Sequence, residues 1–207
     1  MGWMRIDRVS WAERALWAAC VVGSVAPVAL APTREEVAQG YVEAINRGNV
    51  EAALGRMAED VIMRPPLGGQ YTGREQARGV LEYRAALHER WEIVRWEFNG
   101  QEVHADIEIT NDAWSLVGSS PTVSVMLVTR NGLLLLEDSR FNDKPLRRRL
   151  EPFLAWASSY RPEELNVVWQ QDQPVRRGET ALRLVSLLRE WRSAGAPVAA
   201  ADGRGQR

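Results

Sequence analysis

Helical periodicity dominates the first part of the chain after residue 32. Thr33-Arg-Glu-Glu36 has the form of a capping box, in which the threonine hydroxyl accepts a hydrogen bond from the third helical amide and the glutamate reaches back. Val37, Tyr41 and Ile45 then recur at helical spacing, which predicts one apolar stripe. Gly48 is typical of a helix end, and Asn49 is suited to cap a second, short helix.

A short strand and a longer helix follow. The strand is predicted at Val61–Arg64, and Pro65-Pro66 ends it because proline cannot donate a hydrogen bond to a strand ladder. After a turn at Gly68-Gly69, Thr72-Gly-Arg-Glu75 repeats the capping-box pattern. It predicts a helix that runs to about Arg90.

Four segments with strand character come next. Asn99-Gly100 separates the first pair and Asn131-Gly132 the second, and each dipeptide predicts a tight hairpin. The second segment alternates strictly between apolar and polar residues, as a half-buried strand does. The segments are Trp91–Phe98, Glu102–Thr110, Thr122–Thr129 and Leu133–Phe141. Hairpins behind a block of helices predict an α+β fold with a curved antiparallel sheet and N-terminal helices.

The pattern turns helical again after Asn142. Asp143 is suited to cap a helix, Pro162 interrupts it, and Glu179–Arg192 predicts a last amphipathic helix. The chain is therefore divided into an α+β domain at 33–142, a helical extension at 143–192 and a disordered tail at 193–207.

Residues 1–32 form an apolar N-terminal segment that begins with several arginines. Such a start followed by the apolar run 15–31 resembles a secretory signal peptide or an anchor. Pro27 within the run and Pro32 after it favour the alternative of an extra helix or an upstream start codon. The protein is exported or membrane-anchored if this segment acts as a signal, and cytoplasmic otherwise.

Composition limits the classes of function. The 207 residues carry a net charge of -1, which gives no electrostatic basis for binding nucleic acid or, outside the N-terminal segment, a membrane. Cys20 is the single cysteine, so an intramolecular disulfide is excluded, and with two histidines a His-rich zinc centre is excluded as well. We expect no cofactor and no metal.

Two phrases of the sequence carry a family resemblance. The first is Tyr41-Val-Glu-Ala-Ile-Asn-Arg-Gly-Asn-Val-Glu-Ala52, and the second combines Glu59-Asp60-Val61, Pro66, Gly68 and Gly73-Arg74-Glu75. Together with the element order, they resemble the nuclear-transport-factor-2-like superfamily, the cone-shaped α+β fold of the SnoaL-type polyketide cyclases. The matching residues are caps, turns and core positions, so they indicate the cup-shaped fold and leave its contents open.

The resemblance implies a chemistry for those members that are enzymes. They use a pocket carboxylate as base, with Tyr, Asp or Arg stabilising the developing oxyanion. Ketosteroid isomerases and polyketide cyclases abstract a proton next to a carbonyl, and the limonene-epoxide-hydrolase type activates water. A carboxylate suited to this work lies in an apolar pocket that raises its pKa.

Asp138 is the first candidate for such a base. It follows Leu134 and Leu136 at a period of two, which predicts that it shares their inward face, and Arg140 continues that face. Tyr71 is a candidate oxyanion donor. The alternatives are an exposed Asp138–Arg140 ion pair and a Tyr71 that only packs beside the helix.

Further residues are candidates for the pocket wall. His104 and Asp106 lie on the polar face of their strand, where they would form either a catalytic wall or a solvated sheet face. Arg64 has the same ambiguity. Trp96 and Trp114, like Trp91, would line a pocket for a flat apolar ligand, or else be core or dimer contacts.

The sequence favours a small-ligand-binding or accessory domain with an apolar cavity and no defined catalysis. The alternative is a cofactor-free enzyme, namely a polyketide cyclase, a ketosteroid-type isomerase or an epoxide hydrolase. The expected partners are a small apolar molecule and, by analogy with related domains, a second copy of the chain.

Overall fold

The computed structural model describes residues 31–142 and 146–195. Ala31–Arg207 fall into one compact unit, separate from Met1–Leu30. The predicted signal segment, the Asp143 cap and most of the predicted tail therefore lie outside the described residues.

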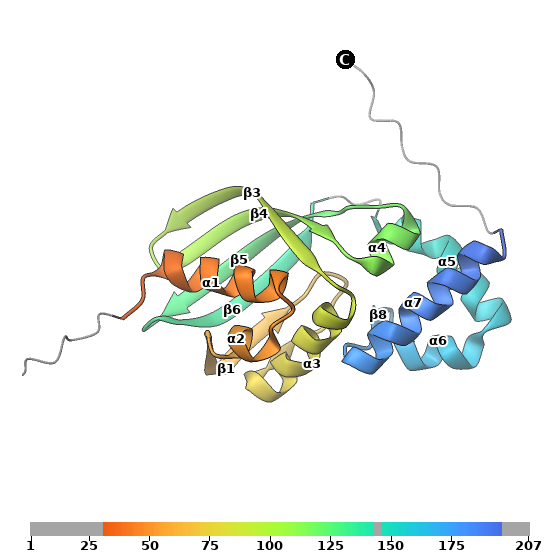
Figure 1. The fold of residues 1–207 in the computed structure, drawn as a ribbon, viewed down its shortest axis with the longest axis horizontal. Coiled ribbons are helices and arrows are strands. Elements are labelled where there is room, and N and C mark those ends of the chain that lie inside the picture. The colour runs from red at the N-terminus through yellow and green to blue at the C-terminus, as the bar shows by residue number, and fades with distance from the viewer. Residues whose placement is uncertain (1–30, 143–145, 196–207) are drawn as a thin grey trace, which may run out of the picture. The chain divides into compact units, whose positions relative to one another are not determined.

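A curved six-stranded sheet forms one layer (Figure 1). Its order is β2-β1-β6-β5-β4-β3, and every neighbouring pair is antiparallel except β1 and β6, which are parallel. The strands are β1 (Met57–Arg64), β2 (Tyr71–Thr72), β3 (Arg90–Asn99), β4 (Glu102–Thr110), β5 (Thr122–Arg130) and β6 (Leu133–Phe141). The predicted α+β fold with a curved sheet is confirmed.

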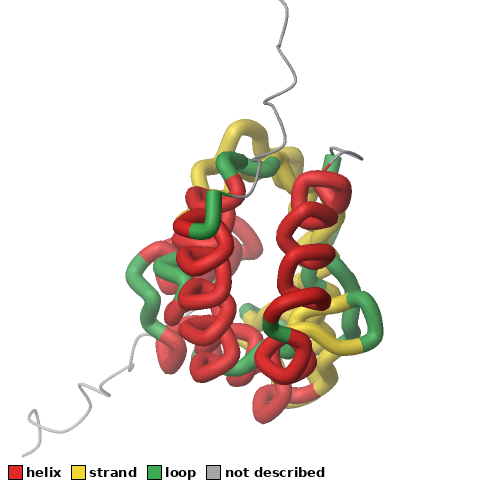
Figure 2. Tube along the Cα trace, turned by 90° about the vertical axis from the view of Figure 1, so that its right-hand side faces the viewer, coloured by secondary structure: helices red, strands yellow, loops and turns green. Residues whose placement is uncertain are grey.

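Helices from both ends of the chain pack beside this sheet. The N-terminal ones are α1 (Arg34–Asn46), α2 (Val50–Leu54) and α3 (Gly73–Ala86), and α4 (Asp112–Val117) lies between β4 and β5. The C-terminal part contains α5 (Leu146–Tyr160), α6 (Pro162–Val168), the short strands β7 (Trp169–Gln170) and β8 (Gln173–Pro174), and α7 (Gly178–Ser193). Helix α7 packs against α3 and α4, and Figure 2 shows the C-terminal helices from their own side.

The helix caps follow the sequence at two of the three predicted places that the structure describes. Thr33 and Glu36 form the capping box, and Asn49 accepts a hydrogen bond from the amide of Ala52 (3.0 Å). At Thr72 the capping box is absent: the side chain makes no cap bond, and the Thr72 amide donates to the Gln76 side chain instead (2.9 Å).

Helix α3 ends earlier than its periodicity predicts. It stops at Ala86, because Leu87 is the C-cap and His88 has a left-handed backbone with φ of 53°. Strand β3 can then begin at Arg90. The predicted loop after Thr110 also differs, since Asn111 caps α4 within it (Asn111 Oδ1 to the Trp114 amide, 2.8 Å).

A β-bulge in β6 decides which of its side chains face the core. Val128 pairs with Leu136 but Thr129 pairs with Leu134, so Leu135 is an extra residue in the strand. A bulge shifts the alternation of side chains by one position. Beyond it, Glu137, Ser139 and Phe141 lie opposite the buried residues Leu127, Val125 and Val123. They therefore face inward with those three residues, and Asp138 and Arg140 face the other way.

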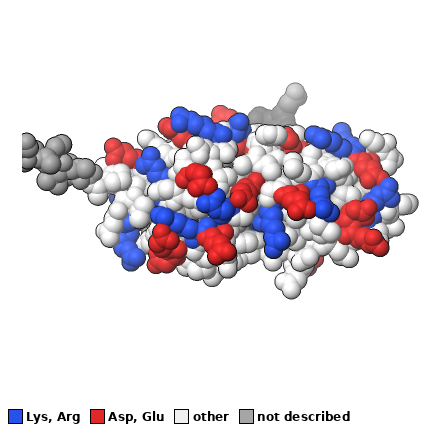
Figure 3. All heavy atoms as spheres, turned by 60° about the horizontal axis from the view of Figure 1, so that its bottom comes forward, with Lys and Arg blue, Asp and Glu red and all other residues white. Residues whose placement is uncertain are grey.

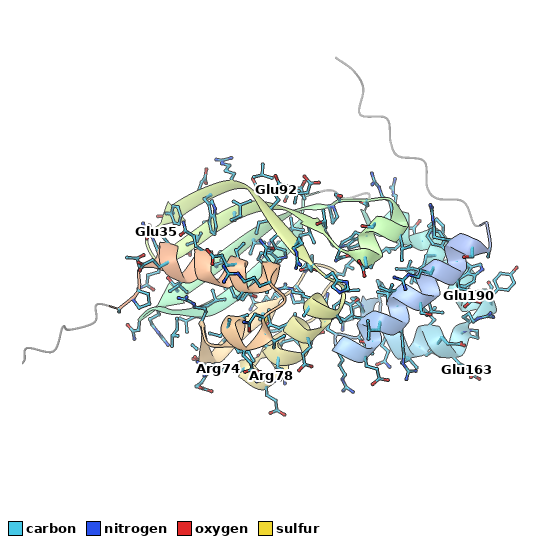
Figure 4. All side chains as sticks on the ribbon, in the orientation of Figure 1. Glu35, Arg74, Arg78, Glu92, Glu163 and Glu190 are labelled. Atoms are coloured by element: carbon cyan, nitrogen blue, oxygen red, sulfur yellow. The ribbon has the colours of Figure 1, made fainter. Side chains whose placement is uncertain are left out.

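Charged side chains of both signs are mixed over the face seen in Figure 3. Arg74 and Arg78 of α3 are labelled in Figure 4. Arg74 donates to the Met57 carbonyl and pairs with Glu59, and Arg78 pairs with Glu51. Within the described ranges, no helix is both long enough and apolar enough to cross a membrane.

Candidate functional site

A small cavity lies between the inner face of the sheet and the C-terminal helices. Its volume is about 70 Å³, several times the roughly 10–15 Å³ that one water molecule needs. The α+β part of the fold, residues 31–142, contributes Trp91, Ile109, Trp114 and Phe141 to its wall, among others. The C-terminal part contributes Leu150, Trp169, Pro174, Leu184 and Leu188. The helices after residue 142 therefore help to enclose this space.

Arg84 is one of the polar side chains that line the cavity. It comes from the apolar stripe of α3, and its guanidinium pairs with the fully buried carboxylate of Glu137 (Nη2–Oε1 2.5 Å, Nη1–Oε2 2.9 Å). The Tyr41 hydroxyl donates to Glu137 (2.5 Å), and Ser139 Oγ donates to its other oxygen (3.0 Å). These donors engage both oxygens of Glu137.

Glu89 is a second buried carboxylate, and it lines the cavity itself. Trp91 Nε1 donates to its Oε1 (2.8 Å), and Asn111 Nδ2 donates to its Oε2 (3.1 Å). Arg84 Nε lies 3.4 Å from Oε1. Because the Arg84 guanidinium also lies over the Trp91 ring (4.9 Å), one arginine joins both carboxylates and an aromatic wall.

The cluster has a fixed charge pattern. Burial by itself raises the pKa of Glu137, but the Arg84 charge and the hydrogen bonds from Arg84, Tyr41 and Ser139 outweigh burial and hold that pKa below its ordinary value. Burial by itself lowers the pKa of Arg84, but Glu137 raises it above its ordinary value. Burial and the Glu137 charge raise the pKa of the Tyr41 hydroxyl. At neutral pH this is a carboxylate, a guanidinium and a neutral phenol.

Arg176 lies on another part of the cavity wall, just before α7. It donates from Nη1 to the Gly68 carbonyl (2.8 Å) and to the Tyr71 hydroxyl (3.3 Å), and from Nη2 to the Pro66 carbonyl (2.7 Å). The loop it holds has left-handed backbone at Leu67, Gly68 and Gly69. Arg176 thus ties the loop before β2 to the C-terminal part of the chain.

Asp138 does not face this cavity. The expectation that it points inward is wrong, because the bulge at Leu135 reverses the alternation and turns Glu137 to the inner face of the sheet instead. Asp138 lies on the outer face of the sheet between two arginines, Arg140 (3.1 Å) and Arg64 (3.6 Å). The structure therefore gives Arg140 and Arg64 as partners of Asp138, away from the cavity.

His104 and Asp106 lie on the same outer face as Asp138 and Arg140. The four side chains border an open hollow of about 430 Å³. His104 contacts Glu102 (2.9 Å), and Asp106 accepts from Ser124 (2.7 Å) and Asn142 (3.3 Å). The hydrogen bonds from Ser124 and Asn142 lower the pKa of Asp106, because they stabilise its charged form.

The aromatic candidates differ in whether they line the cavity. Trp91 and Trp114 line the cavity. Trp96 is partly buried and stacks on Phe98 (centroids 5.8 Å apart), away from the cavity wall. Tyr71 is connected to the cavity wall through Arg176, which donates a hydrogen bond to its hydroxyl (3.3 Å) and lies over its ring (5.8 Å).

Sequence reasoning missed Arg84, Glu89, Glu137 and Arg176 as site residues. Two of them had a usable signal: Arg84 interrupts the apolar stripe of its helix, and Glu137 directly follows the Leu133–Leu136 run. A charge at such a position predicts a buried pair. Within the described part of the chain, no group of His, Cys, Asp and Glu is arranged to hold a metal ion.

Comparison with protein-family models matches residues 38–135 to the SnoaL-like domain. Residues 38–135 are a SnoaL-like domain. The resemblance predicted from the sequence is thereby confirmed. A comparison with curated proteins gives no match.

Several solved structures resemble the region around the SnoaL-like domain. One is an NTF2-like protein of unknown function from Cytophaga hutchinsonii, at 18% identity and a TM-score of 0.47, over 55% of this chain and 94% of that one. Another is a protein from Sphaerobacter thermophilus, at 14% identity and a TM-score of 0.47, over 56% of this chain and 100% of that one. A third is the epoxide hydrolase/cyclase-like enzyme SalBIII, at 15% identity and a TM-score of 0.46, over 53% of this chain and 90% of that one.

The cavity extends beyond the SnoaL-like domain in sequence. Ser139, Phe141 and the whole C-terminal contribution to the wall come after residue 135. Access to the cavity and its chemistry therefore depend on residues outside the matched segment.

Proposed function

We propose that this protein binds a small, largely apolar molecule in the cavity between its SnoaL-like domain and its C-terminal helices, without a chemical step. The observation that carries the proposal is a predominantly apolar cavity wall with a few buried polar groups, among them Arg84, Glu89 and Arg176. Binding sites for small molecules have this composition.

The engagement of the carboxylates favours binding over catalysis. Glu137 accepts from three side chains and is paired with Arg84, and Glu89 accepts from Trp91 and Asn111. A general base needs a lone pair within reach of the substrate proton. These hydrogen bonds direct both carboxylates toward the protein.

A thermal-shift screen of the full chain against hydrophobic ketones, epoxides and aromatic compounds tests the proposal. A ligand that binds the native state raises the melting temperature by mass action. Ala113→Leu adds bulk to the cavity wall, and we expect it to abolish the shift. Ala155→Leu makes the same change at an exposed position of α5 and leaves the shift intact. Equal shifts in the two variants would show that the ligand binds elsewhere.

Glu89 supports the second candidate, a cofactor-free enzyme that abstracts a proton next to a carbonyl. It is a buried carboxylate on the wall of an apolar cavity, which is the setting such a base requires. In D2O, such an enzyme removes the proton on the carbon next to a ketone and returns a deuteron from solvent, so the ketone's proton NMR signal decays. Glu89→Gln should stop that decay while binding persists. No decay with the wild-type protein and a bound ketone would reject this candidate.

A further inference from the structure

Arg84 and Arg176 are the buried arginines of the described part of the chain, and both line the cavity. Their electrostatic partners differ. Arg84 lies within ion-pair distance of Glu137 and Glu89. Across residues 31–142 and 146–195, no carboxylate forms an ion pair with Arg176. A buried charge without an opposite charge is costly unless hydrogen bonds compensate for the lost water.

The hydrogen bonds of Arg176 leave part of its guanidinium free. Its acceptors are the carbonyls of Gly68 and Pro66 and the Tyr71 hydroxyl, reached from Nη1 and Nη2. A guanidinium carries five N–H donors, so Nε–H and one N–H of Nη2 have no acceptor in the described structure. Trp191 Nε1 is the one fully occluded side-chain nitrogen or oxygen there that lacks a partner. Arg176 Nε, which also lacks a partner, is therefore not fully occluded.

We propose that the ligand of this cavity is a small carboxylic acid with an apolar body, bound through its carboxylate to the Nε–H and free Nη2–H of Arg176. This inference rests on the proposed binding function and names its ligand class. Arginine binds a planar carboxylate through two parallel hydrogen bonds, and both partners are charged, which strengthens each bond. The ligand carboxylate would supply the opposite charge that Arg176 lacks.

The other charges of the cavity favour one orientation of such a ligand. Glu89 repels a carboxylate, and Arg176 attracts it. Both residues act on the hydroxyl of Tyr83, which also lines the cavity: burial raises its pKa, Arg176 opposes the rise, and Glu89 adds to it. The acid end is thus directed to Arg176, and the apolar body contacts walls such as Trp169 and Leu188.

The test compares phenylacetate with phenylacetamide, its neutral analogue of the same shape, by isothermal titration calorimetry on the full chain. We expect phenylacetate to bind at least about tenfold more tightly. Equal affinities, or a preference for the amide, would overturn the inference about the acid and leave the proposed binding function standing. If neither compound binds, nor any neutral compound of the thermal-shift screen, the binding function itself fails.

Substitution of the arginine locates the preference. In Arg176→Met, the preference for the acid should disappear, so that the ratio of the two affinities falls to about one. Arg177→Met is the matched control, because it removes the neighbouring, exposed guanidinium, and it should keep the preference. Arg176→Lys retains the positive charge but not the planar guanidinium that forms two parallel hydrogen bonds, so it should keep a reduced preference for the acid. A full preference in a folded Arg176→Met would show that another group binds the acid. The comparison of the two ligands on the wild-type protein needs no variant, so a misfolded Arg176→Met does not remove the test.

Discussion

The guanidinium of Arg84 and the carboxylate of Glu137 form a buried ion pair, with Nη2 and Oε1 2.5 Å apart. The pair joins α3 to β6, and Arg84 continues from it to Glu89 on the cavity wall. It therefore links the stability of the sheet domain to the geometry of the proposed binding site.

Glu137→Gln should destabilise the protein strongly. The variant leaves Arg84 without its main opposite charge, and breaking one side of a buried pair costs about 3–5 kcal/mol. Urea denaturation followed by circular dichroism measures the change in the free energy of unfolding. The double variant Arg84→Met with Glu137→Gln should lose less than the sum of Arg84→Met and Glu137→Gln measured singly, because neither charge of the pair is left without the other. Additive losses would mean that the two groups do not act as a pair.

The same pair predicts that the free energy of unfolding decreases in acid. The folded protein holds the pKa of Glu137 below the ordinary 4.5, so its charged form contributes stability above about pH 4.5. That contribution is lost as the pH falls through the lower, folded-state pKa. The difference in unfolding free energy between wild type and Glu137→Gln should therefore be constant near neutral pH and shrink below about pH 4.5. A difference that grows on acidification contradicts this assignment.

The fold could be predicted from local sequence signals because each signal has a short-range cause. The Thr33 cap needs only Glu36, and the hairpin at Asn131-Gly132 needs only two residues that tolerate positive φ, here 54° and 74°.

The site could be predicted only in part because its geometry is non-local. Whether Glu137 or Asp138 faces inward depends on one extra residue, Leu135, and a bulge has no reliable signal in a run of leucines. Arg176 is 105 positions from Tyr71 in sequence, and only the packed C-terminal helices bring the two together. Trp114 could be predicted as a cavity-lining residue because large aromatic side chains usually fill cores or line pockets.

The two hairpin glycines should differ in their tolerance of alanine. Gly100 has φ of 57° and open space around the position of a Cβ atom, so Gly100→Ala should cost about 1 kcal/mol from backbone strain alone. At Gly132, with φ of 74°, the new Cβ would also lie 2.7 Å from Pro32 Cδ. Gly132→Ala should therefore be the less stable variant in thermal denaturation. Equal melting temperatures would show that the chain around Pro32 yields without cost.

Asp138→Asn should leave ligand binding unchanged to within about twofold, because its side chain lies on the outer face of the sheet, away from the cavity. Ser139→Val, one residue along and on the inner face, should weaken binding, since it removes a hydrogen bond to Glu137 and adds bulk to the cavity wall. Calorimetric titration of both variants with the same ligand checks this. The reverse order of effects would place the ligand on the outer face.

Ligand binding in the cavity is tested most directly by titrating the full chain with phenylacetate or another hit of the thermal-shift screen. The titration is followed by ¹H–¹⁵N NMR through the indole N–H signals of the tryptophans. Trp91, Trp114 and Trp169 line the cavity, whereas Trp96 and Trp156 do not. A ligand in the cavity should shift the first three signals and leave the other two in place. Shifts confined to Trp96 or Trp156, with the cavity tryptophans unchanged, would contradict binding between the SnoaL-like domain and the C-terminal helices.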